Sequence, residues 1–138
     1  MKKSSLIYLI ISIIVAVAIY MVVSTIYKSD YVSEEYYFEG NSENWSVSAK
    51  ILETGDKIYS LTTEISYLNE EEAPERVKWL LNGNGFGTGG EESLTEGKIV
   101  KKEPLREVTI TDNDKITFSI EWNSQSEENI ILTPKKDK

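Results

Sequence analysis

The stretch "NWSVSAKILETGDKIYSLTTEISYL", residues 44–68, decides the fold class. Apolar residues alternate with polar ones on both sides of the short segment "TGDK", which has turn-forming residues. The residues that share one face are Trp45, Val47, Ala49 and Ile51 before the turn, and Tyr59, Leu61, Thr63, Ile65 and Tyr67 after it. A period of two is typical of strands with one buried face, so the stretch predicts an antiparallel hairpin.

The same alternation recurs along the rest of the chain. Further strands are expected at residues 36–40, 76–82, 97–102, 106–111, 115–122 and 129–133. The strand at 106–111 is expected to form a hairpin with the strand at 115–122, across "DND". Pro104 and Pro134 are expected to end strands because proline cannot donate to a ladder. We therefore predict an all-β fold, an immunoglobulin-like antiparallel β-sandwich of seven or eight strands over residues 36–134. Trp45, Trp79 and Trp122 lie on the inward faces and fill much of its core without a disulfide, since the chain has no cysteine.

An uncharged apolar run precedes this domain. Residues 6–27 are long enough to cross a bilayer as a helix, and Lys2 and Lys3 precede them, whereas only Lys28 closely follows. The positive-inside bias predicts a single-pass signal anchor in the cell membrane, with a cytoplasmic end at 1–5, a tether at 28–35, an extracytoplasmic domain and a solvated tail at 135–138. The alternative is a cleaved signal peptide, although the run exceeds the usual apolar length of about 7 to 15 residues.

The exported part is strongly acidic. It contains all 23 acidic residues and all but three of the 15 basic ones, so its charge is three units more negative than the −8 of the whole chain. Such a domain should not bind nucleic acid, and an anionic membrane surface or wall polymer would repel it.

Five glycines crowd the stretch "GNGFGTGG", residues 83–90. A phosphate-binding loop needs a following helix with a lysine and a hydroxyl residue, but here Glu91 and Glu92 follow, so we expect no nucleotide. We interpret the stretch as a long mobile connection in which Asn82-Gly83 and Asn84-Gly85 adopt positive φ angles. Phe86 either pins this loop onto the core, which we favour, or is an exposed anchor for a partner.

The chain is poor in catalytic side chains. It has no histidine and no cysteine, so the usual general base, the thiol nucleophile and the commonest zinc ligands are absent, and no cofactor is expected. Asp112, Asn113 and Asp114 are candidate calcium ligands, and Glu70–Glu72 is a second acidic cluster, but neither has EF-hand spacing. We interpret "TDNDK" as a hairpin turn and the triple glutamate as a solvated loop.

The segment "FEGNSENWSV", residues 38–47, resembles the start of the β-domain in small uncharacterised exported proteins of Gram-positive bacteria, where an "ESENW"-like stretch follows a membrane anchor or lipoprotein signal. The resemblance covers about ten residues and the general layout. It implies an envelope setting and a β fold, with no active residues to carry over. The chain departs from the lipoprotein version because it lacks the cysteine that carries the lipid.

Together these features favour a non-enzymatic, membrane-anchored binding module of the bacterial cell envelope, whose partner is another envelope protein and whose candidate contact is Phe86. The alternative is a calcium-responsive module that uses the carboxylates of its turns. A carboxylate-based hydrolase acting on wall polymers is a third hypothesis, which needs two close carboxylates in a cleft.

Overall fold

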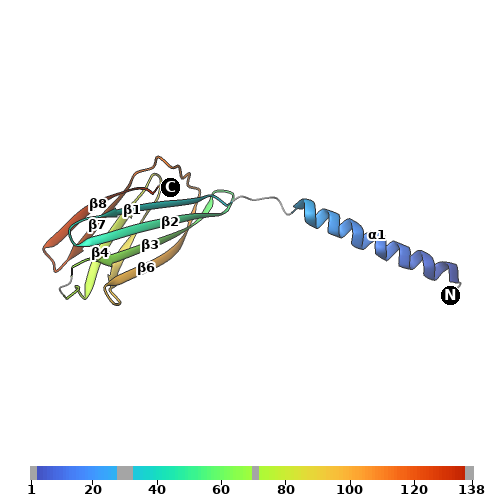
Figure 1. Cartoon of the computed structure of the whole chain (residues 1–138), viewed down its shortest axis with the longest axis horizontal. Helices are drawn as coiled ribbons and strands as arrows, with labels where there is room; N and C mark the ends of the chain where they lie inside the picture. Colours follow the sequence, from blue (N-terminus) through green and yellow to red (C-terminus); the bar gives the residue numbers. More distant parts are fainter. Residues whose placement is uncertain (1–2, 28–32, 70–71, 136–138) are drawn as a thin grey trace. The chain divides into compact units, whose positions relative to one another are not determined.

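The computed structural model of the chain describes residues 3–27, 33–69 and 72–135. It divides the chain into two compact units, Met1–Val32 and Ser33–Lys138 (Figure 1). The expected cytoplasmic end, tether and tail therefore fall partly outside the described residues, as do Lys2, Lys28, Glu70 and Glu71.

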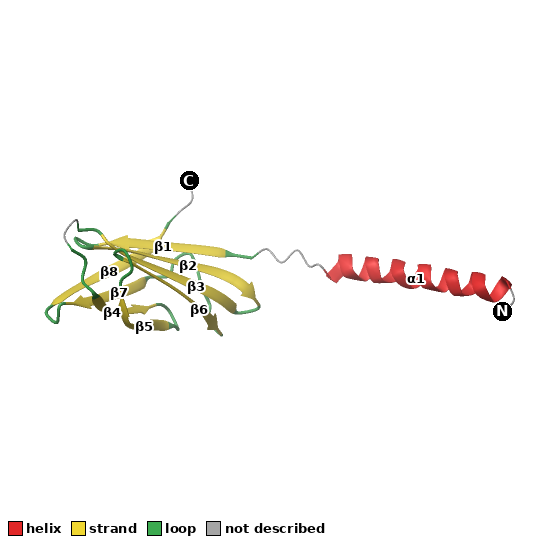
Figure 2. Cartoon of the chain, turned by 90° about the horizontal axis from the view of Figure 1, so that it is seen from below, coloured by secondary structure: helices red, strands yellow, loops and turns green. Residues whose placement is uncertain are grey.

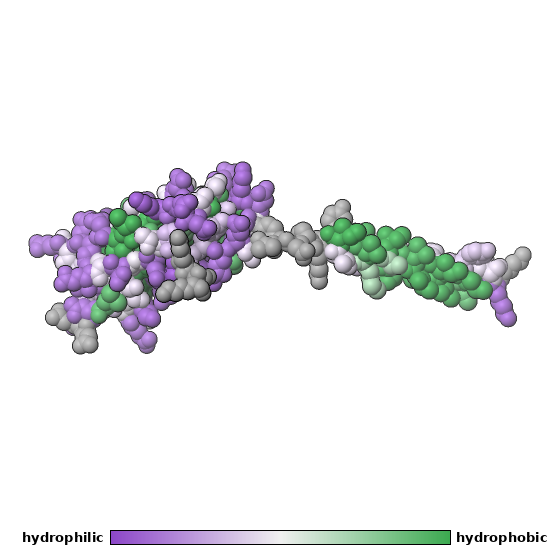
Figure 3. Space-filling view, turned by 45° about the horizontal axis from the view of Figure 1, so that its top comes forward, coloured by the Kyte–Doolittle hydropathy of each residue, from purple (hydrophilic) through white to green (hydrophobic). Residues whose placement is uncertain are grey.

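The first unit contains one helix, α1 (Lys3–Tyr27). Of the described helices it alone is long and apolar enough to cross a membrane, although a signal sequence near an N-terminus has the same properties. Leu6 to Ile11 are consecutive exposed hydrophobic residues, so every side of the helix carries them, and the face seen in Figure 3 is mostly green. The hydroxyls of Ser24 and Thr25 donate to the carbonyl of Met21 at 2.9 and 2.7 Å, so these polar groups are satisfied within the helix.

The second unit is an eight-stranded antiparallel sheet. Its strands are β1 (Glu35–Asn41), β2 (Trp45–Gly55), β3 (Ile58–Tyr67), β4 (Arg76–Asn82), β5 (Gly87–Ser93), β6 (Lys98–Arg106), β7 (Ile116–Trp122) and β8 (Ser126–Pro134). Their order in the sheet is β5-β4-β7-β8-β1-β2-β3-β6, which makes β5 and β6 the two end strands. Figure 2 shows the sheet curling, with β1 on one side of the curl and β4 and β5 on the other.

The immunoglobulin-like sandwich is not confirmed, because the strands form one continuous, barrel-like sheet. The corner of the curl lies between β8 and β1, which pair only through Phe38–Pro134 and Glu39–Thr133. Gly40 lies at this corner, where an added Cβ would be 2.6 Å from the carbonyl oxygen of Ile131. A side chain at this position would force the two strands apart, so the close corner requires glycine.

The inward face of the sheet forms the core. Trp45 is fully buried and Trp79 nearly so, while Trp122 is partly buried and meets Trp45 edge-on at a centroid distance of 5.5 Å. All three tryptophans therefore pack in or against the core, as expected. The other large, fully buried side chains include Phe38, Phe118, Ile51, Leu61, Ile65, Leu81, Ile116, Ile120 and Leu132.

Two strand predictions were wrong. Residues 107–111 form no strand; Val108 and Ile110 are buried, so their alternation reflects burial of a loop. Strand β6 does not end before Pro104 but continues to Arg106, because β6 is an end strand where a missing N–H on the outer edge breaks no ladder bond.

Candidate functional site at the glycine-rich strand

The stretch "GNGFGTGG" forms a tight hairpin and then strand β5, so the predicted long mobile connection was wrong. The N–H of Gly83 donates to the carbonyl of Phe86 at 2.9 Å, and Asn82 pairs with Gly87. Gly85 has a φ of +81°, which favours glycine, whereas Gly83 does not show the expected positive φ. The turn is therefore closed within four residues.

Phe86 packs against the core as a partly buried side chain. A Cβ added to Gly83 would lie 2.2 Å from two ring carbons of Phe86, so the ring covers the bare backbone of Gly83. Pinning of the loop, the favoured interpretation, agrees with this packing, and Phe86 is a poor candidate for an exposed anchor.

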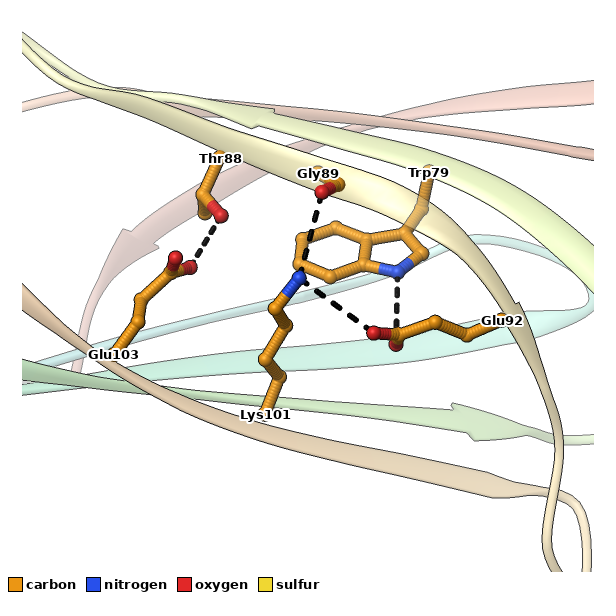
Figure 4. A network of polar contacts seen from close by, with 6 residues as sticks. All are labelled: Trp79, Thr88, Gly89, Glu92, Lys101 and Glu103. Atoms are coloured by element: carbon orange, nitrogen blue, oxygen red, sulfur yellow. Dashed lines mark hydrogen bonds and ion pairs between the residues drawn. The ribbon is translucent and has the colours of Figure 1, made fainter.

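A polar network occupies the inward side of β5 (Figure 4). The ammonium of Lys101, on β6, lies 3.5 Å from a carboxylate oxygen of Glu92, 3.5 Å from the carbonyl oxygen of Gly89 and 5.3 Å from the ring centroid of Trp79. The indole N–H of Trp79 donates to the other oxygen of Glu92 at 3.3 Å. These groups form a cation site that combines an aromatic face, a carboxylate and a backbone carbonyl.

The same network bridges the gap between β5 and β6, the two end strands of the sheet. We call this gap the seam. Strands β5 and β6 follow one another through a two-residue turn at Glu96 and Gly97, with φ angles of +53° and +74°, typical of a hairpin. Thr95 and Lys98 form one bridge with backbone hydrogen bonds of 2.9 and 3.0 Å. Beyond it no strand pairing joins the described parts of β5 and β6, which are the two ends of the sheet order.

Side chains replace the missing ladder along the seam. The hydroxyl of Thr88 donates to the carboxylate of Glu103, and Lys101 reaches Glu92 and Gly89 further along. Figure 4 shows both long side chains extending from β6 towards β5. The hairpin thus begins at its turn and then separates, and side-chain contacts take the place of backbone pairing along the rest of it.

The outward side of β5 adjoins a shallow groove that crosses β5, β4, β7 and β8. Two overlapping depressions share Leu80 and Ser119 in its middle. The registers place two uncharged rows here, Gly89–Leu80–Ser119–Asn129 and Gly87–Asn82–Thr117–Ile131. Leu80 is 47% exposed and Ile131 is 62% exposed. The next row, Glu91–Lys78–Glu121–Glu127, is charged and borders the groove.

The calcium candidates lie in a turn. The two carboxylate oxygens of Asp114 accept hydrogen bonds from the N–H and the hydroxyl of Thr111 at 2.9 and 3.0 Å. Asp112 and Asn113 line a depression beside β1 instead of converging with Asp114. Among the described residues no group of three or more His, Cys, Asp or Glu side chains is arranged to hold a metal ion.

Tyrosines of β1 and β3 lie near this depression. Tyr36 donates its hydroxyl to the carboxylate of Glu34, which together with burial raises the pKa of Tyr36 above its ordinary value. Burial likewise raises the pKa of Tyr59, and the Glu53 charge adds to it. Both phenols stay protonated at neutral pH, so neither supplies a phenolate base or nucleophile there.

Compared with protein-family models, curated proteins and solved structures, the chain matches none of them.

The residues of the seam were missed by the sequence reasoning, although a signal was present. Ile99 and Leu105 are the buried positions of β6, and the alternation places Lys101 and Glu103 on the same inward face. Charged residues at core-facing positions of a strand need partners, which here are Glu92 and Thr88.

Proposed function

We propose that the protein is a membrane-anchored, non-enzymatic binding module that recognises another protein of the cell envelope through the outer groove. The observation that carries the proposal is the pair of exposed aliphatic side chains, Leu80 and Ile131, on two uncharged rows of an otherwise highly charged domain. Both side chains line the same depression, where a partner's apolar side chain could contact them together. The proposal therefore moves the contact from Phe86 to the adjacent strands.

The anchor in this proposal is α1, with its N-terminus in the cytoplasm and the β-domain outside. Its length and apolar surface suit a bilayer, and the lysines at positions 2 and 3 give the positive-inside bias. The groove would then be displayed at the outer face of the cytoplasmic membrane.

Recognition without turnover is supported by the chemistry of the chain. Histidine and cysteine are absent, and at the seam the carboxylates of Glu92 and Glu103 are engaged by Trp79, Lys101 and Thr88. These carboxylates already hold neighbouring side chains in place as hydrogen-bond acceptors and ion-pair partners, a positioning role that suits recognition.

Site-specific photocrosslinking in cells tests the proposal. A photoreactive residue replaces Leu80 in the full-length protein, and a matched variant carries it at Val100, which is 64% exposed on end strand β6. We expect one dominant protein adduct from position 80 and none of that mass from position 100, with loss of the adduct when Ile131→Lys is added. Identical adducts from both positions, or none from position 80, would contradict the proposal.

A further inference from the structure

The two strand edges at the seam differ in how well they are protected against pairing. Strand β6 carries Lys98, Lys101 and Lys102, and Pro104 lacks an N–H, which are the usual means of blocking an edge strand. Strand β5 instead begins "GTGG", so its backbone edge is bare of large side chains over half its length. The edge of β5 is therefore the one that another strand could pair with.

Groups from β6 occupy this edge as substitutes for a neighbouring strand. The ammonium of Lys101 donates to the carbonyl of Gly89, which a backbone N–H would reach in a paired sheet. Glu103 accepts from the hydroxyl of Thr88. Lys101 and Glu103 are both long, flexible side chains, and the Lys101 side chain is 32% exposed, so an incoming strand can displace them by a change of rotamer.

The side chains on the inward side of the β5 edge determine which side chain an incoming strand needs. Displacement of Lys101 leaves Glu92 without its positive partner, in a domain that is already strongly acidic. It also vacates the face of Trp79, beside Gly90, where an added Cβ would lie 3.7 Å from the Lys101 ammonium. A lysine or arginine on the incoming strand restores the charge balance and the cation–π contact together.

We propose that the seam is a strand-acceptor site: an extended, basic segment of a partner protein pairs with the free edge of β5 and places a lysine or arginine in the cation site of Trp79, Glu92 and the Gly89 carbonyl. Main-chain hydrogen bonds supply the affinity, and the cation site supplies the specificity. This site adjoins the outer groove at Gly89, but it uses the inward side chains of Trp79 and Glu92, whereas the groove presents the outward Leu80 and Ile131.

Peptide binding to the full-length protein in detergent micelles tests the proposal. The probe is a capped peptide of seven residues, the length of β5, in which lysine and valine alternate. One control peptide has glutamate in place of lysine, and a second keeps the lysines but has N-methylated amides on its pairing edge. We expect binding of the lysine peptide alone, with slower amide hydrogen exchange in residues 87–93. Equal binding of the N-methylated peptide, or no binding of the lysine peptide, would overturn the proposal.

Two lysine variants separate competition at the seam from general charge effects. Lys101→Met keeps an apolar stem on Trp79 but removes the competing ammonium, so the lysine peptide should bind about tenfold more tightly, which corresponds to about 1.4 kcal/mol. Lys102→Met removes the same charge from the opposite face of β6 and should leave the affinity within about twofold of the parent protein.

A third variant keeps the test decisive if Lys101→Met fails to fold. Glu92→Gln preserves the side-chain shape and an acceptor for Trp79 but removes the negative charge of the cation site, so it should weaken the lysine peptide about tenfold. Unchanged affinity in this variant, or equal affinities for Lys101→Met and Lys102→Met, would overturn the proposal. Neither result bears on crosslinking from Leu80, so the two proposals fail independently.

Discussion

At the scale of single residues, the most instructive position is Thr63, in the middle of β3. It lies on the inward face opposite Ala49 and Lys101, is 1% exposed, and its hydroxyl has no hydrogen-bond partner among the described residues. The indole N–H of Trp45 is in the same situation. A buried hydroxyl without a partner loses its hydration and gains nothing in return.

Thr63→Val should therefore stabilise the β-domain. Valine has nearly the same shape and suits a strand, so the change removes the desolvation cost and should raise the free energy of unfolding by about 1 kcal/mol. Urea unfolding monitored by tryptophan fluorescence measures it. The control is Thr62→Val on the opposite face of the same strand, which should change stability by less than about 0.5 kcal/mol. A destabilised Thr63→Val protein would show that the hydroxyl is hydrogen-bonded in solution.

At the scale of elements, alternation located strands well wherever apolar side chains mark the inward face. Strands β2, β3, β4 and β7 follow their predicted ranges closely for this reason. Strand β5 was missed because its first residues are glycine and threonine, which leave no apolar pattern to find. The strand predicted at 106–111 was wrong for the opposite reason, because Val108 and Ile110 are buried in a loop and alternate as they would in a strand.

Which strands pair with one another could not be predicted from the sequence. Alternation gives the buried face of each strand but not its neighbour, so one curled sheet and two stacked sheets have the same pattern. The seam follows from the strand order alone, because Lys101 meets Glu92 only when β5 and β6 end the same curled sheet. The outer groove was missed likewise, because its rows combine residues of four strands.

In the turn between β4 and β5, the contribution of Gly83 to stability should depend on the ring of Phe86. Gly83→Ala would place a methyl group where the ring of Phe86 lies, forcing the ring off the core. We expect it to cost about 1 to 2 kcal/mol of unfolding free energy in the parent protein and less than about 0.5 kcal/mol in a Phe86→Ala background. The four proteins of this double-mutant cycle are compared by urea unfolding. Additive costs would show that the ring does not rest on Gly83 in solution.

At the scale of the whole molecule, an apolar helix and an acidic β-domain occupy separate parts of one chain. The two parts differ in the polarity of their surfaces. Helix α1 exposes apolar side chains, whereas the face of the β-domain seen in Figure 3 is mostly hydrophilic. A polar domain of this charge does not enter a bilayer, so in the proposed topology the seam and the groove would both face water outside the membrane.

The proposed topology predicts which end of the chain outside reagents can reach. The protein has no cysteine, so a single one can be introduced without background, as Asp112→Cys in an exposed turn or Ser4→Cys in the first turn of α1. In intact bacterial cells, a membrane-impermeant maleimide should label Asp112→Cys, and it should label Ser4→Cys only after the membrane is opened, because the positive-inside bias of Lys2 and Lys3 favours a cytoplasmic N-terminus. The labelled protein should stay in the membrane fraction at its full mass. A shorter labelled product in the soluble fraction would show that α1 is a cleaved signal sequence, and labelling of Ser4→Cys in intact cells would reverse the orientation.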